Sequence, residues 1–154
     1  MPILLLALLI GIIAGLRAFT APTVVSWAAH LGWINLAGTH LAFLSSPITV
    51  GILSFCAIGE IVNDKLPNTP SRKIPPQFGA RIVTGGFAGA ALGLSHDSLI
   101  AGLLAGAVGA VIGTLGGSAV RGALAKAFGK DLPAALLEDC IAVGGGFLLV
   151  SLAR

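Results

Sequence analysis

Residues 99–117 read LIAGLLAGAVGAVIGTLGG, a run without a charged side chain and with a glycine every three or four positions. About 20 apolar residues cross the hydrocarbon core of a bilayer as a helix. The whole chain shares this character, since its 154 residues are 56% hydrophobic and only 10% charged. So little polar surface cannot coat a water-soluble protein of this size. We therefore predict a single all-α domain over residues 1–154, a membrane bundle of about five transmembrane helices.

The predicted spans follow from the apolar runs and from helix start and stop residues. Pro22 removes a backbone donor and predicts a break in the first span, and Gly116-Gly117-Ser118 predicts one in the fourth. Ser46 and Pro47 suit the cap and first turn of the second span. We expect spans at about 3–30 with a break near 20–22, 46–65, 78–94, 98–128 with a break near 116–118, and 132–152.

The two interrupted spans have similar layouts. Segments 11–32 and 109–129 each run from a glycine-spaced apolar helix through a breaker into an amphipathic segment that ends in glycine. If the first span runs outward and the fourth inward, the pair forms an inverted repeat. Many secondary transporters line a midplane site with broken helices related in this way.

Basic residues predict the orientation. The net charge is +3, and the basic residues gather beside the second and fourth loops as Lys65, Arg72, Lys73 and Arg81, then Arg121, Lys126 and Lys130. Because cytoplasmic loops are enriched in Lys and Arg, we predict a multi-pass protein of the cell inner membrane with a cytoplasmic N-terminus and the C-terminus outside. The basic residues lie next to apolar spans, so the expected partner is the lipid bilayer and no nucleic acid.

Glycines form two stripes that predict close helix packing. A glycine recurs every fourth residue in the third span, at Gly85, Gly89 and Gly93, and in the fourth, at Gly109, Gly113 and Gly117. Stripes without side chains let helices approach closely. The partner helix lies either in the same chain or in another subunit, and with about five spans we expect a homo-oligomer, a dimer being favoured.

Charged residues within the spans are the candidate functional residues, because each is costly in lipid unless it is paired or hydrated. We expect an acidic and basic cluster near the cytoplasmic edge, with Glu60, Glu138 and Asp139 paired against Arg81 and Arg121. Asp64, one turn after Glu60 on the same helix face, is expected to reach the interface and to belong to the same polar path. One interpretation is a set of salt bridges that clamps the bundle. Another is a polar cavity in which a carboxylate exchanges a proton or cation, and a third is solvation at the interface.

Arg17 is expected to stand apart from this cluster. It lies 14 residues into the first span, and a helical rise of about 21 Å would carry it toward the outer half of the bilayer. The guanidinium either extends to the outer surface, binds an anionic head group or substrate carboxylate, or belongs to an internal ion pair.

No motif for catalysis or metal binding is present. His30, His40 and His96 occur singly, and Cys56 and Cys140 lie in different spans without paired spacing, which indicates ordinary packing. No nucleophile, base and orienting group occur together. We expect no catalytic residues, no metal, no cofactor and no enzymatic activity.

Four stretches of the sequence resemble a known family. They are GLRAFTAP at 15–22, GEIVNDKLPNTPSR at 59–72, GAR at 79–81 and the Glu138-Asp139 pair. In these the chain resembles the small bacterial membrane proteins grouped as domain of unknown function 4126, over nearly its whole length. That resemblance implies a membrane protein and leaves the activity open.

Two functions fit these features. The first is a secondary transporter or permease-like protein for a small solute, an ion or a lipid head group, with the polar path formed by the cluster and Arg17. The alternative is a structural or accessory membrane protein that assembles through its glycine stripes and transports nothing.

Overall fold

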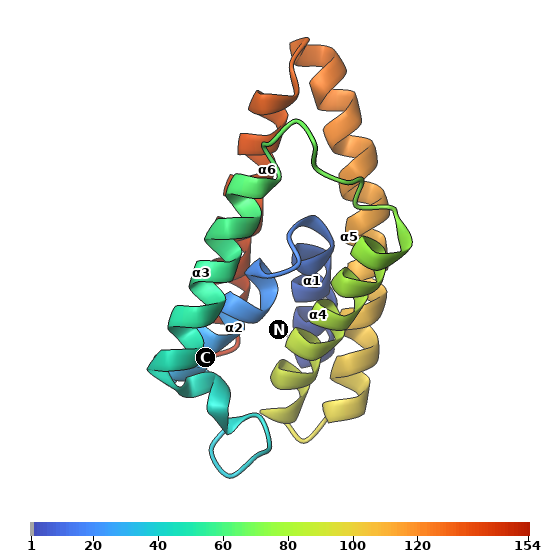
Figure 1. The fold of residues 1–154 in the computed structure, drawn as a ribbon. Coiled ribbons are helices and arrows are strands. Elements are labelled where there is room, and N and C mark those ends of the chain that lie inside the picture. Colours follow the sequence, from blue (N-terminus) through green and yellow to red (C-terminus); the bar gives the residue numbers. More distant parts are fainter. Residues whose placement is uncertain (1) are drawn as a thin grey trace.

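A computed structural model describes residues 2–154, and this part of the chain contains helices and no strand. It has six α-helices and one short 3₁₀ helix. Their bounds are α1 (Ile3–Leu16), α2 (Thr20–His30), η1 (Ala42–Ser45), α3 (Pro47–Asn63), α4 (Pro75–Leu94), α5 (Leu99–Phe128) and α6 (Asp131–Ser151). Figure 1 shows α1 and α2 in the middle of the bundle, with α3 on one side and α4 and α5 on the other.

Helices α1 and α2 form a hairpin in place of the single span expected over 3–30. α1 runs parallel to α5, since Gly11 lies against Gly106 and Gly15 against Thr114. α2 runs antiparallel to α3, because the Phe19 amide meets Glu60 and His30 meets Ser45. α2 therefore returns toward the end of the bundle where α1 begins.

The break within this hairpin lies earlier than Pro22 predicted. It covers Arg17–Phe19, and Pro22 is the third residue of α2. The first backbone N–H groups of a helix have no partner within it, so a proline there breaks no hydrogen bond. Pro22 marks the start of α2 and causes no kink within it.

Both chain termini lie toward the same end of the bundle (Figure 1). The guanidinium of Arg154 stacks over the Trp33 ring, 5.4 Å from its centre, beside the connection after α2. The proline-rich connection 64–74 and the α5–α6 turn lie at the opposite end (Figure 1). Because the first predicted span is two helices that run in opposite directions, the described chain begins and ends toward the same end of the bundle, whereas five alternating spans would place its ends at opposite ends.

Helix α5 is continuous from Leu99 to Phe128, so the predicted break at 116–118 is wrong. The predicted inverted repeat required a second interrupted helix, and α5 does not provide one. A glycine costs a helix only about 1 kcal/mol relative to alanine, so it permits a break without requiring one. The other bounds agree within three residues, and Ser46 caps α3 by accepting a hydrogen bond from the Ile48 amide at 3.3 Å.

The glycine stripes pack helices of the same chain against each other. A methyl group on Gly89 would overlap the carbonyl oxygen of Gly102 across the α4–α5 contact, and one on Gly113 would overlap that of Ile12 on α1. Gly85, Gly93 and Gly109 meet neighbouring helices in the same way, whereas Gly117 faces the side chain of Leu16. At these six positions, the residues that contact the glycines belong to the same chain.

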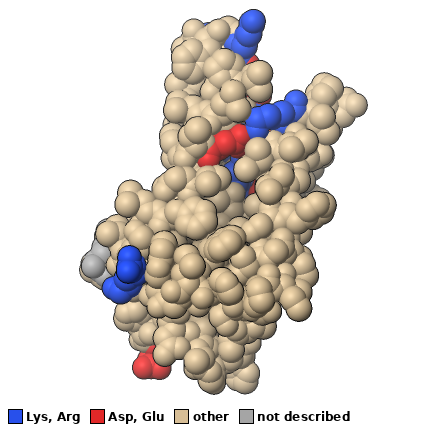
Figure 2. Space-filling view, turned by 90° about the vertical axis from the view of Figure 1, so that its left-hand side faces the viewer, with Lys and Arg blue, Asp and Glu red and all other residues tan. Residues whose placement is uncertain are grey.

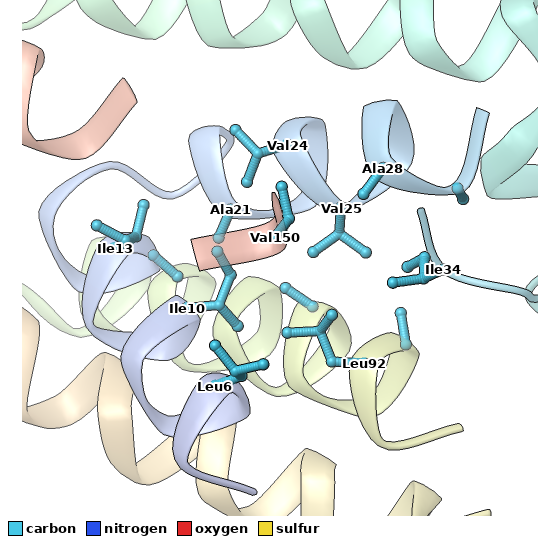
Figure 3. Packing of buried hydrophobic residues seen from close by; sticks show 14 of the residues in the cluster. Leu6, Ile10, Ile13, Ala21, Val24, Val25, Ala28, Ile34, Leu92 and Val150 are labelled. Atoms are coloured by element: carbon cyan, nitrogen blue, oxygen red, sulfur yellow. The ribbon is translucent and has the colours of Figure 1, made fainter. Parts of the chain in front are cut away.

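The buried core centres on the hairpin (Figure 3). Leu6 and Ile10 of α1 lie among Val25 of α2, Leu92 of α4 and Val150 of α6, and each of these side chains is at most 1% exposed. The hairpin is enclosed by the longer helices, which leaves their opposite faces outward.

Those outward faces are strongly apolar. On α3 they carry Ile48, Ile52, Phe55, Ile58 and Val62, all between 57% and 79% exposed. α5 and α6 are long and apolar enough to cross a membrane. In the most apolar 18 residues of each helix, only 33% of the α5 residues and 39% of the α6 residues are buried. α1 and α3 are apolar but shorter. By length and composition, the structure thus contains two candidate membrane spans.

Candidate functional site

The three-residue break between α1 and α2 places Arg17 at the centre of a buried charge cluster. Its side chain is fully buried. The Nε group donates a 2.7 Å hydrogen bond to Asp139, and Nη2 lies 2.5 Å from the same carboxylate oxygen. Nη1 lies 2.8 Å from Asp64. The two Nη groups lack hydrogen-bond alignment despite these short distances, so their contacts are mainly electrostatic.

A second ion pair, Glu60 and Arg81, binds the backbone N–H and C=O groups that the two helix ends leave unpaired at the break. The backbone N–H groups of Ala18 and Phe19 donate to the two carboxylate oxygens of Glu60 at 2.8 and 2.9 Å. Arg81 donates through Nη1 to the carbonyl of Leu16 at 2.9 Å, and its Nη2 lies 3.7 Å from Glu60. An anion at a helix N-terminus and a cation at a C-terminus both oppose the helix dipole.

Glu138 on α6 joins the proline-rich connection to α5. It accepts two hydrogen bonds from Arg72, at 2.5 and 2.9 Å, in a bidentate arrangement. Its Oε2 atom also accepts from Arg121 at 3.2 Å. Arg121 in turn binds Asp131 through two donors, at 3.0 and 2.6 Å. The first turn of α6 is fastened in this way to the last third of α5.

Like Glu138, two further carboxylates are shared between cations. Asp64 contacts both Arg17 and Arg121, and Asp139 contacts both Arg17 and Lys65. Burial would raise the pKa of the Asp64 carboxyl, but the hydrogen bond from Arg121 and the charges of Arg17 and Arg121 outweigh burial and hold this pKa below its usual value. Asp64 is therefore ionised at neutral pH.

The structure brings the residues of the predicted cluster together and adds five members. Glu60, Arg81, Arg121, Glu138 and Asp139 lie together, and Asp64, expected at the interface, joins them. Arg17 was expected in the outer half, but the α1–α2 hairpin brings it to the same place, in an internal ion pair. Sequence reasoning missed Lys65, Arg72 and Asp131, which it treated as loop or helix-start residues, and it gave Thr20 no role.

The charges of this cluster balance. Five cations, Arg17, Lys65, Arg72, Arg81 and Arg121, meet five carboxylates, Glu60, Asp64, Asp131, Glu138 and Asp139. Within residues 2–154, no group of three or more His, Cys, Asp or Glu is placed to hold a metal ion. The arrangement suits exchange of partners among charges and contains no recognisable catalytic constellation.

One hollow adjoins the cluster, and a second lies beside α2. One, of about 360 Å³, opens at the end of the bundle that carries connection 64–74 and is lined by Asp64, Arg72, Ser118, Arg121 and Asp131. Figure 2 shows acidic and basic side chains gathered in a notch at one end of the molecule. The other, of about 260 Å³, lies between α2, α3 and α6 and is lined by Thr20, Thr23, Trp27, Ser54, Val143 and Phe147, among others.

Besides the two Nη groups of Arg17, two buried polar atoms near the break have no hydrogen-bond partner within the described chain. They are the Thr20 hydroxyl and Nε of Arg81. An unpaired buried polar group costs about 1–3 kcal/mol. Thr20 is 2% exposed and belongs to the lining of the hollow beside α2, so this lining includes a hydroxyl group without a hydrogen-bond partner.

Comparison with known proteins identifies the family. The chain matches the family model described as Domain of unknown function (DUF4126) over residues 4–153, and it belongs to that family. No curated protein and no solved structure matches it.

Proposed function

We propose that this protein is a multi-pass membrane protein that acts as a small permease for a charged solute, an ion or a lipid head group. The observation that carries the proposal is the charge cluster at the tip of a helical hairpin, with one hollow lined by cluster residues and another lined by Thr20 at the start of α2. Half-helices that meet a charged site inside a bundle are the device by which many secondary transporters bind their substrates.

The surface supports placement in a bilayer. Large apolar side chains cover the outward faces of α3, α5 and α6, whereas a water-soluble monomer rarely exposes apolar patches above a few hundred Å². Since basic loops favour the cytoplasm, connection 64–74 and the α5–α6 turn would face inward. Both termini would then face outward, and the α1–α2 hairpin would enter from the outer side and return to it.

Shared carboxylates make movement within the cluster energetically feasible. Breaking an isolated buried ion pair costs about 3–5 kcal/mol, because one charge is left without a partner. Asp64 can release Arg17 and keep Arg121, and Asp139 can release Arg17 and keep Lys65. A solute charge could thus replace one partner of Arg17 without leaving a bare carboxylate.

The experiment that tests a path is thiol accessibility. In a background with Cys56→Ser and Cys140→Ser, single cysteines replace Ser118 in the loop-side hollow, Thr20 in the α2 hollow, or Ala28, which is fully buried in the core. An impermeant thiol reagent is added to either face of oriented proteoliposomes.

A permease predicts that Ser118→Cys reacts from the loop side and that Thr20→Cys reacts from the side of the termini, while Ala28→Cys reacts from neither. If Thr20→Cys is as inert as Ala28→Cys from both faces, the cluster is a sealed clamp and the permease proposal fails. The alternative is an accessory protein that transports nothing, and its assembly surface would lie outside the glycine stripes, because those glycines contact helices of the same chain.

A further inference from the structure

We propose that the α5–α6 end of the bundle binds one anionic lipid, with its hydrocarbon tail in an apolar groove and its acidic head group beside Arg121. This inference rests on the bilayer placement proposed above and names a ligand class for the same charged end of the protein.

The tail site is a groove of about 300 Å³ between α1, α5 and α6. Its walls are aliphatic, with Ile12 and Leu16 on α1, Val120 and Leu124 on α5, and Leu137 and Ile141 on α6. Gly116 belongs to the same groove, and a side chain placed there would meet no atom within 4 Å. The missing side chain leaves room along α5 that the neighbouring helices do not fill.

The polar end of the groove coincides with the charge cluster. Arg121 and Glu138 lie in the groove lining, and Arg121 also lines the loop-side hollow together with Arg72 and Ser118. A single residue therefore connects an apolar groove to a polar hollow. An amphiphile fits this arrangement, whereas a purely polar solute would leave the groove empty and a purely apolar one would leave the hollow empty.

The charge of this end selects an anion. The cluster itself balances, but Lys73, Lys126 and Lys130 at the same end are exposed and form no ion pair within residues 2–154. Lys126 lies in the last turn of α5, beyond Arg121, and Lys130 directly precedes Asp131. A phosphate or carboxylate head group would meet uncompensated positive charge here, and guanidinium groups bind such oxygens through paired hydrogen bonds.

The experiment is lipid titration of the purified full chain in detergent, with bound lipid counted by native mass spectrometry. The probes are dioleoylphosphatidylglycerol, dioleoylphosphatidylcholine and inorganic phosphate. We expect one phosphatidylglycerol per chain, bound at least tenfold more tightly than phosphatidylcholine, and no retained inorganic phosphate. Equal affinity for the two lipids would overturn the charge argument, and retention of phosphate alone would indicate a free-anion site in place of a lipid site.

Amino-acid substitutions test the lipid-tail groove and the head-group site separately. Gly116→Leu fills the groove and should abolish the bound lipid, while Gly144→Leu, on the exposed face of α6 with open space around it, should bind as wild type does. Lys126→Gln combined with Lys130→Gln should weaken phosphatidylglycerol binding about thirtyfold, since each basic residue near an anionic lipid surface adds about 1 kcal/mol and about 1.4 kcal/mol is tenfold in affinity. Undiminished binding in Gly116→Leu would overturn the groove site.

The two proposals fail separately. Loss of the lipid result with Thr20→Cys still reactive would remove the lipid site and keep the permease. Tight, groove-dependent lipid binding with Thr20→Cys inert from both faces would keep the lipid site and remove transport.

Discussion

Replacement of Arg17 by methionine tests whether the buried cluster holds the hairpin in place. The guanidinium lies between Asp64 and Asp139 and is fully buried. Removing one partner of a buried ion pair costs about 3–5 kcal/mol. Arg121 and Lys65 remain as second partners of the two carboxylates, so we expect a loss near the lower figure, about 3 kcal/mol.

The matching measurement is the melting temperature of the purified protein in detergent, followed by tryptophan fluorescence and circular dichroism. For a chain of this size, 1 kcal/mol corresponds to about 2–4 °C, so Arg17→Met should melt about 10 °C below wild type. Arg17→Lys keeps the charge, but one ammonium group cannot span the two carboxylates as the planar guanidinium does. The melting temperature of Arg17→Lys should fall by about half as much as that of Arg17→Met.

The control is Lys73→Met, which removes an exposed cation that has no ion pair within residues 2–154. It should melt within about 2 °C of wild type, as exposed charges contribute little. An Arg17→Met protein that melts as Lys73→Met does would refute the assignment of Arg17 as the central member of the cluster.

Three further predictions concern packing, topology and pH. Gly113→Ala should lower the melting temperature markedly, because its methyl group overlaps the Ile12 carbonyl, whereas Gly116→Ala should leave it unchanged or raise it; equal effects would contradict the packing. Cysteines placed at either terminus should react with an impermeant reagent from the same face of oriented vesicles, and Lys73→Cys from the other; termini reacting from opposite faces would exclude the hairpin. Because the folded-state pKa of Asp64 is depressed, its stabilisation is present at neutral pH and is lost as pH falls through that folded pKa. Melting temperature should fall on acidification, less steeply in Asp64→Asn; parallel profiles would rule this out.

The helices and the charged cluster were predictable from the sequence because both depend on local composition. Apolar runs and capping residues such as Ser46 placed α3 to α6 within three residues. Charged residues within apolar helices had to find partners, since isolated charges are costly in apolar surroundings. The identity of those partners was less accessible, because Lys65 and Arg72 reach the cluster only through the path of the proline-rich connection.

The hairpin was not predictable from periodicity. Residues 3–30 contain enough apolar length for one crossing, and Pro22 drew attention to a break at the wrong position. What turns the chain is the pairing of the exposed helix ends with distant side chains. The Phe19 amide binds Glu60, 41 residues further along the chain, and the Leu16 carbonyl binds Arg81, 65 residues further along. Hydrophobic patterns describe a helix face and carry no information on such distant polar partners.

The hairpin and the cluster depend on each other. A break in apolar surroundings exposes backbone N–H and C=O groups that lipid cannot satisfy, each at a cost of several kcal/mol. Glu60 and Arg81 occupy the positions at the two helix ends where an anionic and a cationic group would otherwise bind. Arg17 then balances the carboxylates that α3 and α6 bring to the same depth. Most polar groups of the cluster are already paired with one another or with the helix ends. In the proposed permease, a charged solute would therefore be accommodated at the unpaired Thr20 hydroxyl and at the shared carboxylates of Asp64 and Asp139.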